Sequence, residues 1–359
     1  MTHTPPTAAA SFSAKLWPFA SRAAAPAPMT RITDQLHFGP TLDIAARSAA
    51  SISKLQVPEN QDNLLIIDAD GSAILLHEQT PQTTKVPGWP SGHVRLAVLD
   101  GMGGHGHGRQ AAEAVATGLL HIPACHSLEE LSTHLDQLHQ KLQARFSRPD
   151  DHDTFRRPGT TLTLLEIAPG RAPMLYHVGD SRLYEITPQA ATPLTVDHVP
   201  ATAFAMHGLL GEDEWRQQVH GEHRAQISQA YILGNAFANP QMLDDGLLPL
   251  DAGNLPPFLH QLADRRTLTL RPGASYLLAT DGFWSCARPQ PWISRWPALL
   301  AQPSAGQALD ALFRDYAENP PPQLHIDNLS AIVLRFEPAQ NSGNVDETAL
   351  PTAPIPSHF

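Results

Sequence analysis

The stretch Leu96–Gly108, LAVLDGMGGHGHG, begins with apolar residues, reaches a carboxylate at Asp100, and then places glycine at five of the next eight positions. An apolar run that stops at such a break indicates the end of a buried strand. The segment that follows, Gly108–Ile122, is rich in good helix formers and has an apolar face. The sequence therefore predicts a buried strand that ends on a carboxylate and turns through glycines into a helix.

More strands are predicted on both sides of this stretch, together with one long helix. Asn63–Asp68 and Ala73–Glu78 flank an Asp70-Gly71 pair, which indicates a hairpin. Reading the turn as the start of a calcium loop is disfavoured, because Glu78 misses the twelfth position that such a loop needs. Leucines at helical spacing predict a helix over Ser127–Phe146. The other predicted strands are 160–167, 173–180, 182–187, 267–270, 275–281 and 329–336.

Composition narrows the class of protein. The 359 residues are 42% hydrophobic and 16% charged, which is typical of a globular protein, and no apolar run reaches the roughly 18 residues of a membrane span. A net charge of -11 with only 24 Lys and Arg argues against nucleic-acid binding. Cys125 and Cys286 stand apart without a partner motif, which predicts two reduced thiols in a cytoplasmic protein.

The two ends of the chain differ from its middle. Residues 1–40 are predicted to be a low-complexity, disordered extension, because the first 28 are rich in Ala, Pro, Ser and Thr and lack a continuous apolar region for secretion. Met29 is an alternative start. Residues 338–359 are predicted to be a disordered tail. One domain is expected over 41–337.

Aspartates recur at the ends of the predicted strands. Asp100, Asp180, Asp281 and Asp327 each follow an apolar run, and Asp62 precedes the first strand of the hairpin. One such Asp is most often a turn former or helix cap. Several together indicate that distant strand ends meet around hard cations, because carboxylate oxygens, carbonyls and waters are the ligands that Mg²⁺ and Mn²⁺ prefer.

The ordered motifs of the chain identify a resemblance. They are ENQD at 59–62, DGMGGH at 100–105, GTT at 159–161, GDSR at 179–182, TDG at 280–282 and DN at 327–328. This set resembles the metal-dependent Ser/Thr protein phosphatases of the 2C type, the PPM family, in the form common in bacteria. The resemblance covers Leu42 to Phe336. It implies an α+β fold, a four-layer αββα sandwich of two antiparallel sheets packed face to face with helices outside.

The resemblance also implies a role for each matching residue. Asp100 matches the carboxylate that bridges two metal ions, Mn²⁺ or Mg²⁺, and Gly101 the residue that offers one of them its carbonyl. Asp281 and Asp327 match the remaining direct ligands of the other ion. Asp62 matches a residue that holds metal-bound water. Asp180, with Asp281, matches the third, weaker metal site of bacterial members.

Three positions depart from the family's pattern. Val57 stands where an Arg or Lys usually holds the substrate phosphate, and Lys54 is a candidate substitute. Gln61 replaces a Glu, and Ser285 replaces a further Asp after TDG. None of these departures removes a predicted ligand.

Other residues near the motifs have two possible interpretations. His105 and His107 are predicted to be structural rather than catalytic. Arg182 is expected to pair with a neighbouring carboxylate in preference to phosphate. The segment 199–228 matches a mobile flap, with an ordinary surface helix pair as the alternative.

The predicted function is hydrolysis of phosphoserine and phosphothreonine on proteins, by a water that two metals activate. The expected partners are a phosphorylated protein substrate and an opposing Ser/Thr kinase, with no nucleic acid and no membrane, and the chain is expected to be a monomer. A second hypothesis, encouraged by Val57, is an inactive phosphatase-like module that binds a phosphoprotein or kinase. A calcium-binding protein or an unrelated metal hydrolase would leave the ordered motifs unexplained.

Overall fold

The computed structural model describes residues 32–51, 59–103, 107–146 and 157–337. All of them belong to one compact unit, Arg31–Phe359. The predicted C-terminal tail and residues 1–31 of the predicted extension lie outside the described residues, as do Lys54, Val57 and His105. The domain boundaries therefore stay a prediction.

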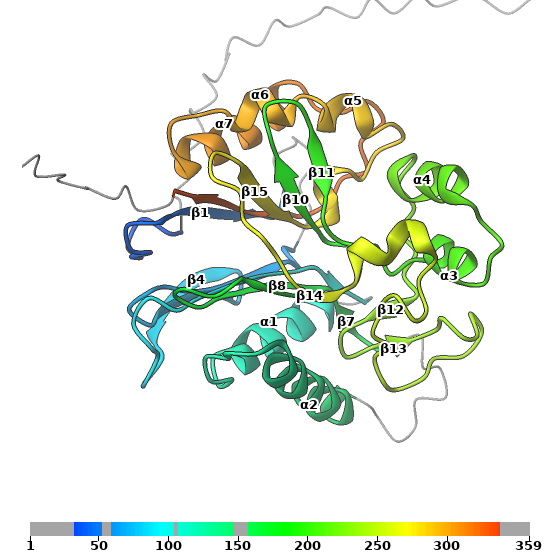
Figure 1. Cartoon of the computed structure of the whole chain (residues 1–359), viewed down its shortest axis with the longest axis horizontal. Coiled ribbons are helices and arrows are strands. Elements are labelled where there is room, and N and C mark those ends of the chain that lie inside the picture. The colour runs from blue at the N-terminus through cyan, green and yellow to red at the C-terminus, as the bar shows by residue number, and fades with distance from the viewer. Residues whose placement is uncertain (1–31, 52–58, 104–106, 147–156, 338–359) are drawn as a thin grey trace, which may run out of the picture. The chain divides into compact units, whose positions relative to one another are not determined.

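Two antiparallel sheets form the centre of the unit (Figure 1). The larger sheet has the strand order β14-β9-β8-β5-β2-β3-β4, and the smaller has the order β1-β16-β15-β10-β11. The strands of the larger sheet are β2 (Asn63–Ile67), β3 (Ser72–His77), β4 (Thr80–Lys85), β5 (Val94–Leu99), β8 (Leu162–Ile167), β9 (Met174–Val178) and β14 (Arg265–Thr267). Those of the smaller sheet are β1 (Leu42–Ala49), β10 (Arg182–Ile186), β11 (Ala191–Pro193), β15 (Ser275–Ala279) and β16 (Leu329–Phe336).

The alternation of side chains along β5 shows how the layers are built. Leu96 and Val98 pack into the core between the two sheets, whereas Ala97 and Leu99 pack on the opposite face, against a helix. All four are buried, because successive side chains of a strand point to opposite faces and both faces of this strand are covered. The apolar run at 96–99 is therefore continuous rather than alternating.

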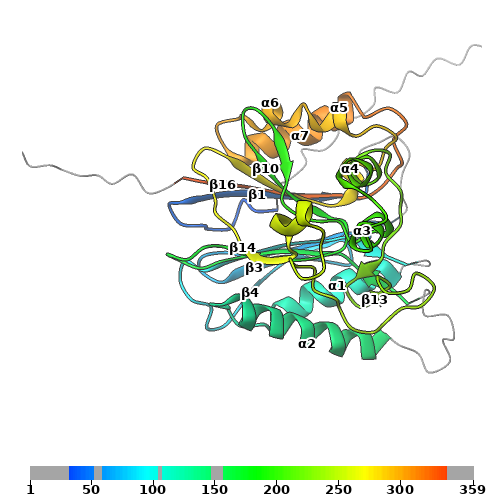
Figure 2. The same ribbon diagram turned by 45° about the vertical axis from the view of Figure 1, so that its right-hand side comes forward.

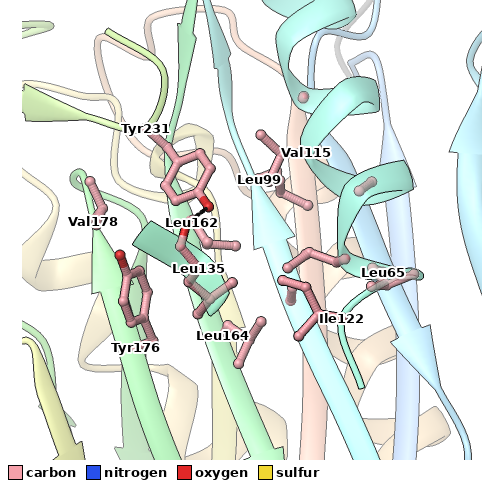
Figure 3. Close-up of a cluster of buried hydrophobic side chains, with 14 of the residues drawn as sticks. Leu65, Leu99, Val115, Ile122, Leu135, Leu162, Leu164, Tyr176, Val178 and Tyr231 are labelled. Atoms are coloured by element: carbon pink, nitrogen blue, oxygen red, sulfur yellow. Dashed lines mark hydrogen bonds between the residues drawn. The ribbon is translucent and has the colours of Figure 1, made fainter. Parts of the chain in front are cut away.

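Helices α1 (His107–Leu119) and α2 (Leu128–Phe146) cover the outer face of the larger sheet (Figures 1 and 2). The cluster in Figure 3 joins α1, through Val115, to Leu65 and Leu99 of the sheet. The Tyr231 hydroxyl donates a hydrogen bond to the Leu135 carbonyl, which satisfies the polar end of a buried aromatic side chain (Figure 3).

The outer face of the smaller sheet is covered by α5 (Gln290–Ile293), α6 (Trp296–Leu300) and α7 (Ala305–Glu318). Figure 2 shows these helices on the far side of the two sheets from α1 and α2. The order of layers is helix, sheet, sheet, helix, which confirms the predicted α+β sandwich.

A third group of elements lies beside the sandwich (Figure 1). Helices α3 (Pro200–Met206) and α4 (Glu212–His220) pack with the 3-10 helix η2 (Pro257–Leu262) around a core of their own that includes Trp215 and Phe237. The pair β12 (Gln229–Ala230) and β13 (Gly234–Asn235) follows α4. The segment 199–228, predicted as a flap, thus contains two helices.

Most predicted elements are present, and the exceptions have physical causes. The hairpin β2–β3 is confirmed, and the Asp68 carboxylate accepts hydrogen bonds from the amides of Asp70 and Ser72 within its turn. The strand predicted at 267–270 is wrong in its position, since β14 ends at Thr267. Strand β4 was not predicted, because its residues are all exposed and an edge strand covered on neither face needs no apolar pattern.

Candidate metal centre

Asp100 lies immediately after β5, where main-chain bonds fix the chain. Its amide donates to the Thr161 hydroxyl, and its carbonyl accepts from the Thr161 amide, each at 2.9 Å. The next residues form the short strand β6 (Gly101–Met102), which pairs with β7 (Gly159–Thr160). The Asp100 side chain therefore starts from a backbone that is held on both sides.

Gly101 is required by close approach of the backbone. A Cβ added there would lie 2.4 Å from the carbonyl oxygens of both Gln61 and Gly108. No other residue fits between these two segments without moving them. The glycines thus bring the start of α1 and the segment carrying Asp62 against the chain that carries Asp100.

A second glycine brings Asp281 and Asp327 together. Asp281 begins the short 3-10 helix η3 (Asp281–Phe283) after β15, and a Cβ on Gly282 would lie 1.9 Å from the Asn328 carbonyl oxygen. The prediction that Asp327 ends a strand is wrong, because β16 begins after it at Leu329. Since β16 is antiparallel to β15, the start of one strand lies beside the end of the other.

Asn328 ties Asp62 to the same place. Its Oδ1 accepts from the Gln61 amide at 2.7 Å, and its Nδ2 donates to the carbonyls of Ala50 and Glu59. The Thr280 hydroxyl donates to Asp62 Oδ2 at 2.8 Å. Asp62 is therefore held in one orientation beside the end of β15.

Asp180 comes from the larger sheet, two residues after the end of β9. It is buried, and the Asp281 charge acts directly on it. The charges of Asp62, Asp180, Asp281 and Asp327 all act on Asp100, so these five residues lie near one another although they come from both sheets.

The carboxyl groups influence one another's ionisation. Burial and the charges of Asp281, Asp62, Asp327 and Asp180 raise the pKa of Asp100 well above its usual range. Burial and the charge of Asp327 do the same to the pKa of Asp62. Burial and the Asp281 charge raise the pKa of Asp180 to about 8 and that of Asp327 to about 6. Asp180 thus tends to hold its proton near neutral pH when no cation is bound.

The donor set fits divalent metal ions. Buried like charges are costly unless a cation neutralises them, and a bound cation would reverse the upward pKa shifts. Carboxylate oxygens and the Gly101 carbonyl are the hard oxygen donors that Mg²⁺ and Mn²⁺ prefer. The five aspartates and Gly101 are therefore the residues able to hold such ions.

Comparison with known proteins gives one partial sequence match and many similar folds. No family profile matches the chain. Over 125 residues it is 31% identical to a protein of Streptococcus pyogenes serotype M6, provisionally described as a protein phosphatase of the 2C type; the match covers 34% of this chain and 50% of that protein. The chain thus spans about half the length of this curated relative.

Solved structures match over most of the chain. The S. agalactiae serine/threonine phosphatase aligns with 82% of this chain and 100% of its own, at a TM-score of 0.56 and 18% identity. The Mycobacterium tuberculosis serine/threonine phosphatase PstP/Ppp aligns with 83% of this chain and 100% of its own, at 0.52 and 22%. The PstP catalytic domain in complex with two manganese ions matches at 0.52 and 20%, over 83% of this chain and 99% of its own.

The chain has the fold of the 2C-type protein phosphatases. The resemblance inferred from the six motifs is confirmed by these matches. Among the described residues of this phosphatase 2C fold, no helix is both long and apolar enough to cross a membrane.

One residue beside Asp281 in this phosphatase 2C fold was not predicted from the sequence. His223, three residues after α4, places Nε2 2.9 Å from Oδ2 of Asp281. The His223 imidazole lowers the pKa of Asp281, although burial alone would raise it. No motif marks His223, since its contact is made across the fold rather than along the chain.

A small cavity of about 120 Å³ lies beside this contact. Its lining includes Asp180, His223 and Arg224. Arg224 is exposed, and its guanidinium has no hydrogen bond or ion pair with any residue that the structure describes.

The remaining predicted residues have identifiable positions. Arg182 donates to both oxygens of Asp197, at 2.7 to 3.1 Å, which confirms the expected pairing with a carboxylate. His107 begins α1, where its Nδ1 lies 3.4 Å from Gln110 Oε1. Ser285 is buried, and its amide donates to the Asp281 carbonyl at 2.8 Å.

Proposed function

We propose that the chain is a metal-dependent protein phosphatase that hydrolyses phosphoserine and phosphothreonine on proteins, opposing a Ser/Thr kinase. The observation that carries this proposal is that five aspartates from both sheets, three of them buried and two half-buried, lie close enough for their charges to act on one another. The similar S. agalactiae and M. tuberculosis proteins are described as serine/threonine phosphatases, and this supports the substrate class. Monomeric state and cytoplasmic location stay predictions.

Each aspartate has a proposed task. Asp100 would bind two ions, Gly101 would give its carbonyl to one of them, and Asp281 and Asp327 would bind the other. Bound Mn²⁺ or Mg²⁺ supplies positive charge for the phosphoryl oxygens and lowers the pKa of a water that attacks phosphorus.

The other side chains would orient and balance these groups. Thr280 donates to Asp62, so the oxygens of Asp62 face one way and can accept a hydrogen bond from water. Asp180 would hold the third ion together with Asp281. Arg182 is committed to Asp197 and has no part in phosphate binding.

Retention of every predicted ligand favours an enzyme over the alternative, a phosphatase-like module that binds phosphoproteins without turnover. Arg224 adds to this, because this exposed residue lines the cavity that Asp180 also lines. An uncommitted cation beside the centre suits a phosphate dianion.

The proposal is tested by hydrolysis of a phosphothreonine peptide and of p-nitrophenyl phosphate with Mn²⁺, Mg²⁺, Ca²⁺ or EDTA. We expect Mn²⁺-dependent turnover that EDTA abolishes. Asp281→Asn should lower kcat by about 100- to 1000-fold or more, the loss typical of removing one group that stabilises the transition state.

The exposed Asp213 of α4 offers a matched control, since Asp213→Asn makes the same chemical change away from the centre. Its kcat should equal that of the unmodified chain. Absence of turnover from folded protein that has bound Mn²⁺ would contradict the proposal and favour the binding module.

A further inference from the structure

Three different metal-binding side chains, Cys125, Glu130 and His134, meet outside the aspartate centre. One ligand atom from each, the sulfur, a carboxylate oxygen and an imidazole nitrogen, lies within 4.8 Å of the other two. Cys125 is buried, and the other two residues are half-buried. The cluster is therefore compact and can be reached from the surface.

The order of these residues along the chain explains how they meet. Glu130 and His134 are four residues apart on α2, so their side chains are neighbours on one face of the helix. Cys125 lies three residues before α2 begins at Leu128. The Ser127 hydroxyl accepts a hydrogen bond from the Glu130 amide at 3.1 Å, which fixes the start of the helix. The first two turns of α2 thus present a carboxylate and an imidazole to the residue that precedes the helix.

Backbone hydrogen bonds orient the groups of the cluster. The His126 amide donates to Glu130 Oε2 at 2.9 Å, which keeps the carboxylate beside the main chain next to Cys125. The Cys125 amide donates to Glu166 Oε1 at 3.0 Å. Glu166 is itself paired with Arg95, so it orients the cysteine and is not offered to an ion. Metal ligands in proteins are commonly held by such outer contacts.

The surroundings of the Cys125 sulfur favour a cation over chemical reactivity. Burial and the charges of Glu166 and Glu130 raise the pKa of the thiol to about 12, although the charge of Arg95 acts in the opposite direction. Such a thiol is a poor nucleophile. A bound divalent cation reverses the balance, because a coordinating thiol gives up its proton. The Pro123 carbonyl, which accepts from the thiol at 3.3 Å, keeps its other hydrogen bond, from Arg95 Nη2 at 2.8 Å.

The spacing of the three ligand atoms suits a zinc ion. In a tetrahedral site with Zn–S at about 2.3 Å and Zn–N and Zn–O at about 2.1 Å, the ligand atoms lie about 3.4–3.6 Å apart. The atoms of the cluster lie within 4.8 Å of one another. Rotation of the half-buried Glu130 and His134 side chains is enough to close the remaining distance.

We propose that Cys125, Glu130 and His134 form a zinc site that joins the segment before α2 to the first turns of that helix, with water as the fourth ligand. Zn²⁺ accepts thiolate, imidazole and carboxylate together, whereas Mg²⁺ and Mn²⁺ prefer oxygen. The Glu166 carboxylate that accepts the Cys125 amide pairs with the start of β5, whereas Asp100 follows its end. The zinc site is therefore separate from the aspartate centre and does not rest on the proposed function.

Titration with Co²⁺ tests this inference, because Co²⁺ replaces Zn²⁺ and absorbs in the near ultraviolet when a thiolate binds it. The full chain, kept reduced by a reductant without a thiol, should develop this absorption, and added Zn²⁺ should remove it. Co²⁺ bound by the aspartates has no thiolate ligand and gives no such absorption. The measurement thus reports on the cysteine site alone.

Matched variants identify the ligands. Cys125→Ser should abolish the absorption, whereas Cys286→Ser, which removes the other free cysteine, should keep it. His134→Gln and Glu130→Gln should each weaken Zn²⁺ binding at this site at least about 100-fold, the upper end of the loss seen for outer-shell partners of metal ligands. Glu129→Gln is the control for Glu130→Gln, since Glu129 lies in the same turn of α2 but is exposed, and its affinity should be unchanged.

Absence of thiolate absorption from the folded, reduced chain would overturn the inference, as would its persistence in Cys125→Ser. Either result leaves the proposed function intact. Thiolate absorption in a chain that shows no Mn²⁺-dependent turnover would support the zinc site and contradict only the proposed function.

Discussion

Strand β5 carries a buried arginine near one end and is followed by a half-buried aspartate at the other, and the charges of these two residues have opposite surroundings. Near its start, Arg95 donates to both oxygens of Glu166, at 2.6 and 2.9 Å, and His93 lies 2.8 Å from the same carboxylate. Beyond its end, Asp100 faces four other carboxyl groups.

The ionisation of the two regions reflects this contrast. Burial would raise the pKa of Glu166, but Arg95 and His93 more than offset it, so that pKa lies below its usual range. The pKa of Asp100 is raised instead. A balanced cluster needs no ligand, whereas an unbalanced one points to a cation. The region around Arg95 therefore stabilises the fold, and the region around Asp100 has the charge of a cation-binding site.

The largest effect is expected at the balanced end. Arg95→Met removes the charge that compensates Glu166 and three hydrogen bonds, to the carbonyls of Leu119, Ile122 and Pro123. The free energy of unfolding should fall by about 3–5 kcal/mol, as is usual when one partner of a buried ion pair is removed. Urea denaturation of the metal-free chain measures this loss.

Arg216→Met provides the control, because Arg216 forms an exposed pair with Glu212 on α4. That change should cost less than about 1 kcal/mol. If both variants lose the same stability, the buried ion pair at the start of β5 contributes no more than the exposed pair on α4. That result would contradict the contrast between the two ends of β5.

Beyond the end of β5, a substitution is expected to stabilise the metal-free chain, which is opposite in sign to the effect of Arg95→Met. Asp100→Asn should stabilise the metal-free chain by about 1–3 kcal/mol, because it removes a carboxyl group whose ionisation is opposed by desolvation and by four neighbouring carboxyl groups. The same variant should lose the increase in melting temperature that Mn²⁺ gives the unmodified chain. Thermal denaturation with EDTA and with Mn²⁺ measures both effects.

Exposed Asp213 again supplies the control, and Asp213→Asn should change neither quantity. Destabilisation of the metal-free chain by Asp100→Asn would show that this aspartate supports the fold rather than the ions. The contrast between the two ends of β5 would then disappear.

The sequence predicts those parts of this contrast that arise within a short segment, and it does not predict those that depend on contacts between residues far apart in the chain. The motif aspartates and the glycine-rich turn were predicted, because each sits at a break between an apolar strand and the next element. Helices α1 and α2 were predicted from their apolar spacing. The partner of Arg95 was not, since Glu166 lies on a neighbouring strand and its carboxylate looks like any other along the chain.

The same limit explains His223 and Asp327. His223 stands in a polar segment without a pattern, and only the fold brings it to Asp281. Asp327 was correctly grouped with the other aspartates, although the strand beside it begins after the residue instead of ending before it. A single apolar residue such as Ile326 carries no periodicity that could define a strand.

A third buried cluster, around His177, consists of uncharged groups. The stability change expected there depends on pH. His177 on β9 has Nδ1 2.9 Å from the Thr163 hydroxyl and Nε2 3.1 Å from the Val196 carbonyl, so it is satisfied as a neutral imidazole. Burial lowers its pKa to about 3. Neutralising the group is thus a third way to bury an ionisable residue, beside pairing it and binding a cation.

The low pKa of His177 predicts a pH dependence of stability. Its contribution is complete above the unfolded pKa of about 6.5 and is lost as pH falls toward 3, because the unfolded chain then binds the proton more readily. The stability advantage of the unmodified chain over His177→Gln should therefore shrink by about 1.4 kcal/mol per pH unit below 6.5, or about 2 kcal/mol at pH 5. Urea denaturation at pH 7.5 and pH 5 measures the difference, with exposed His121→Gln as the control. An advantage that stays constant with pH would mean that His177 takes up its proton as readily in the fold as in the unfolded chain, which would contradict burial as a neutral group.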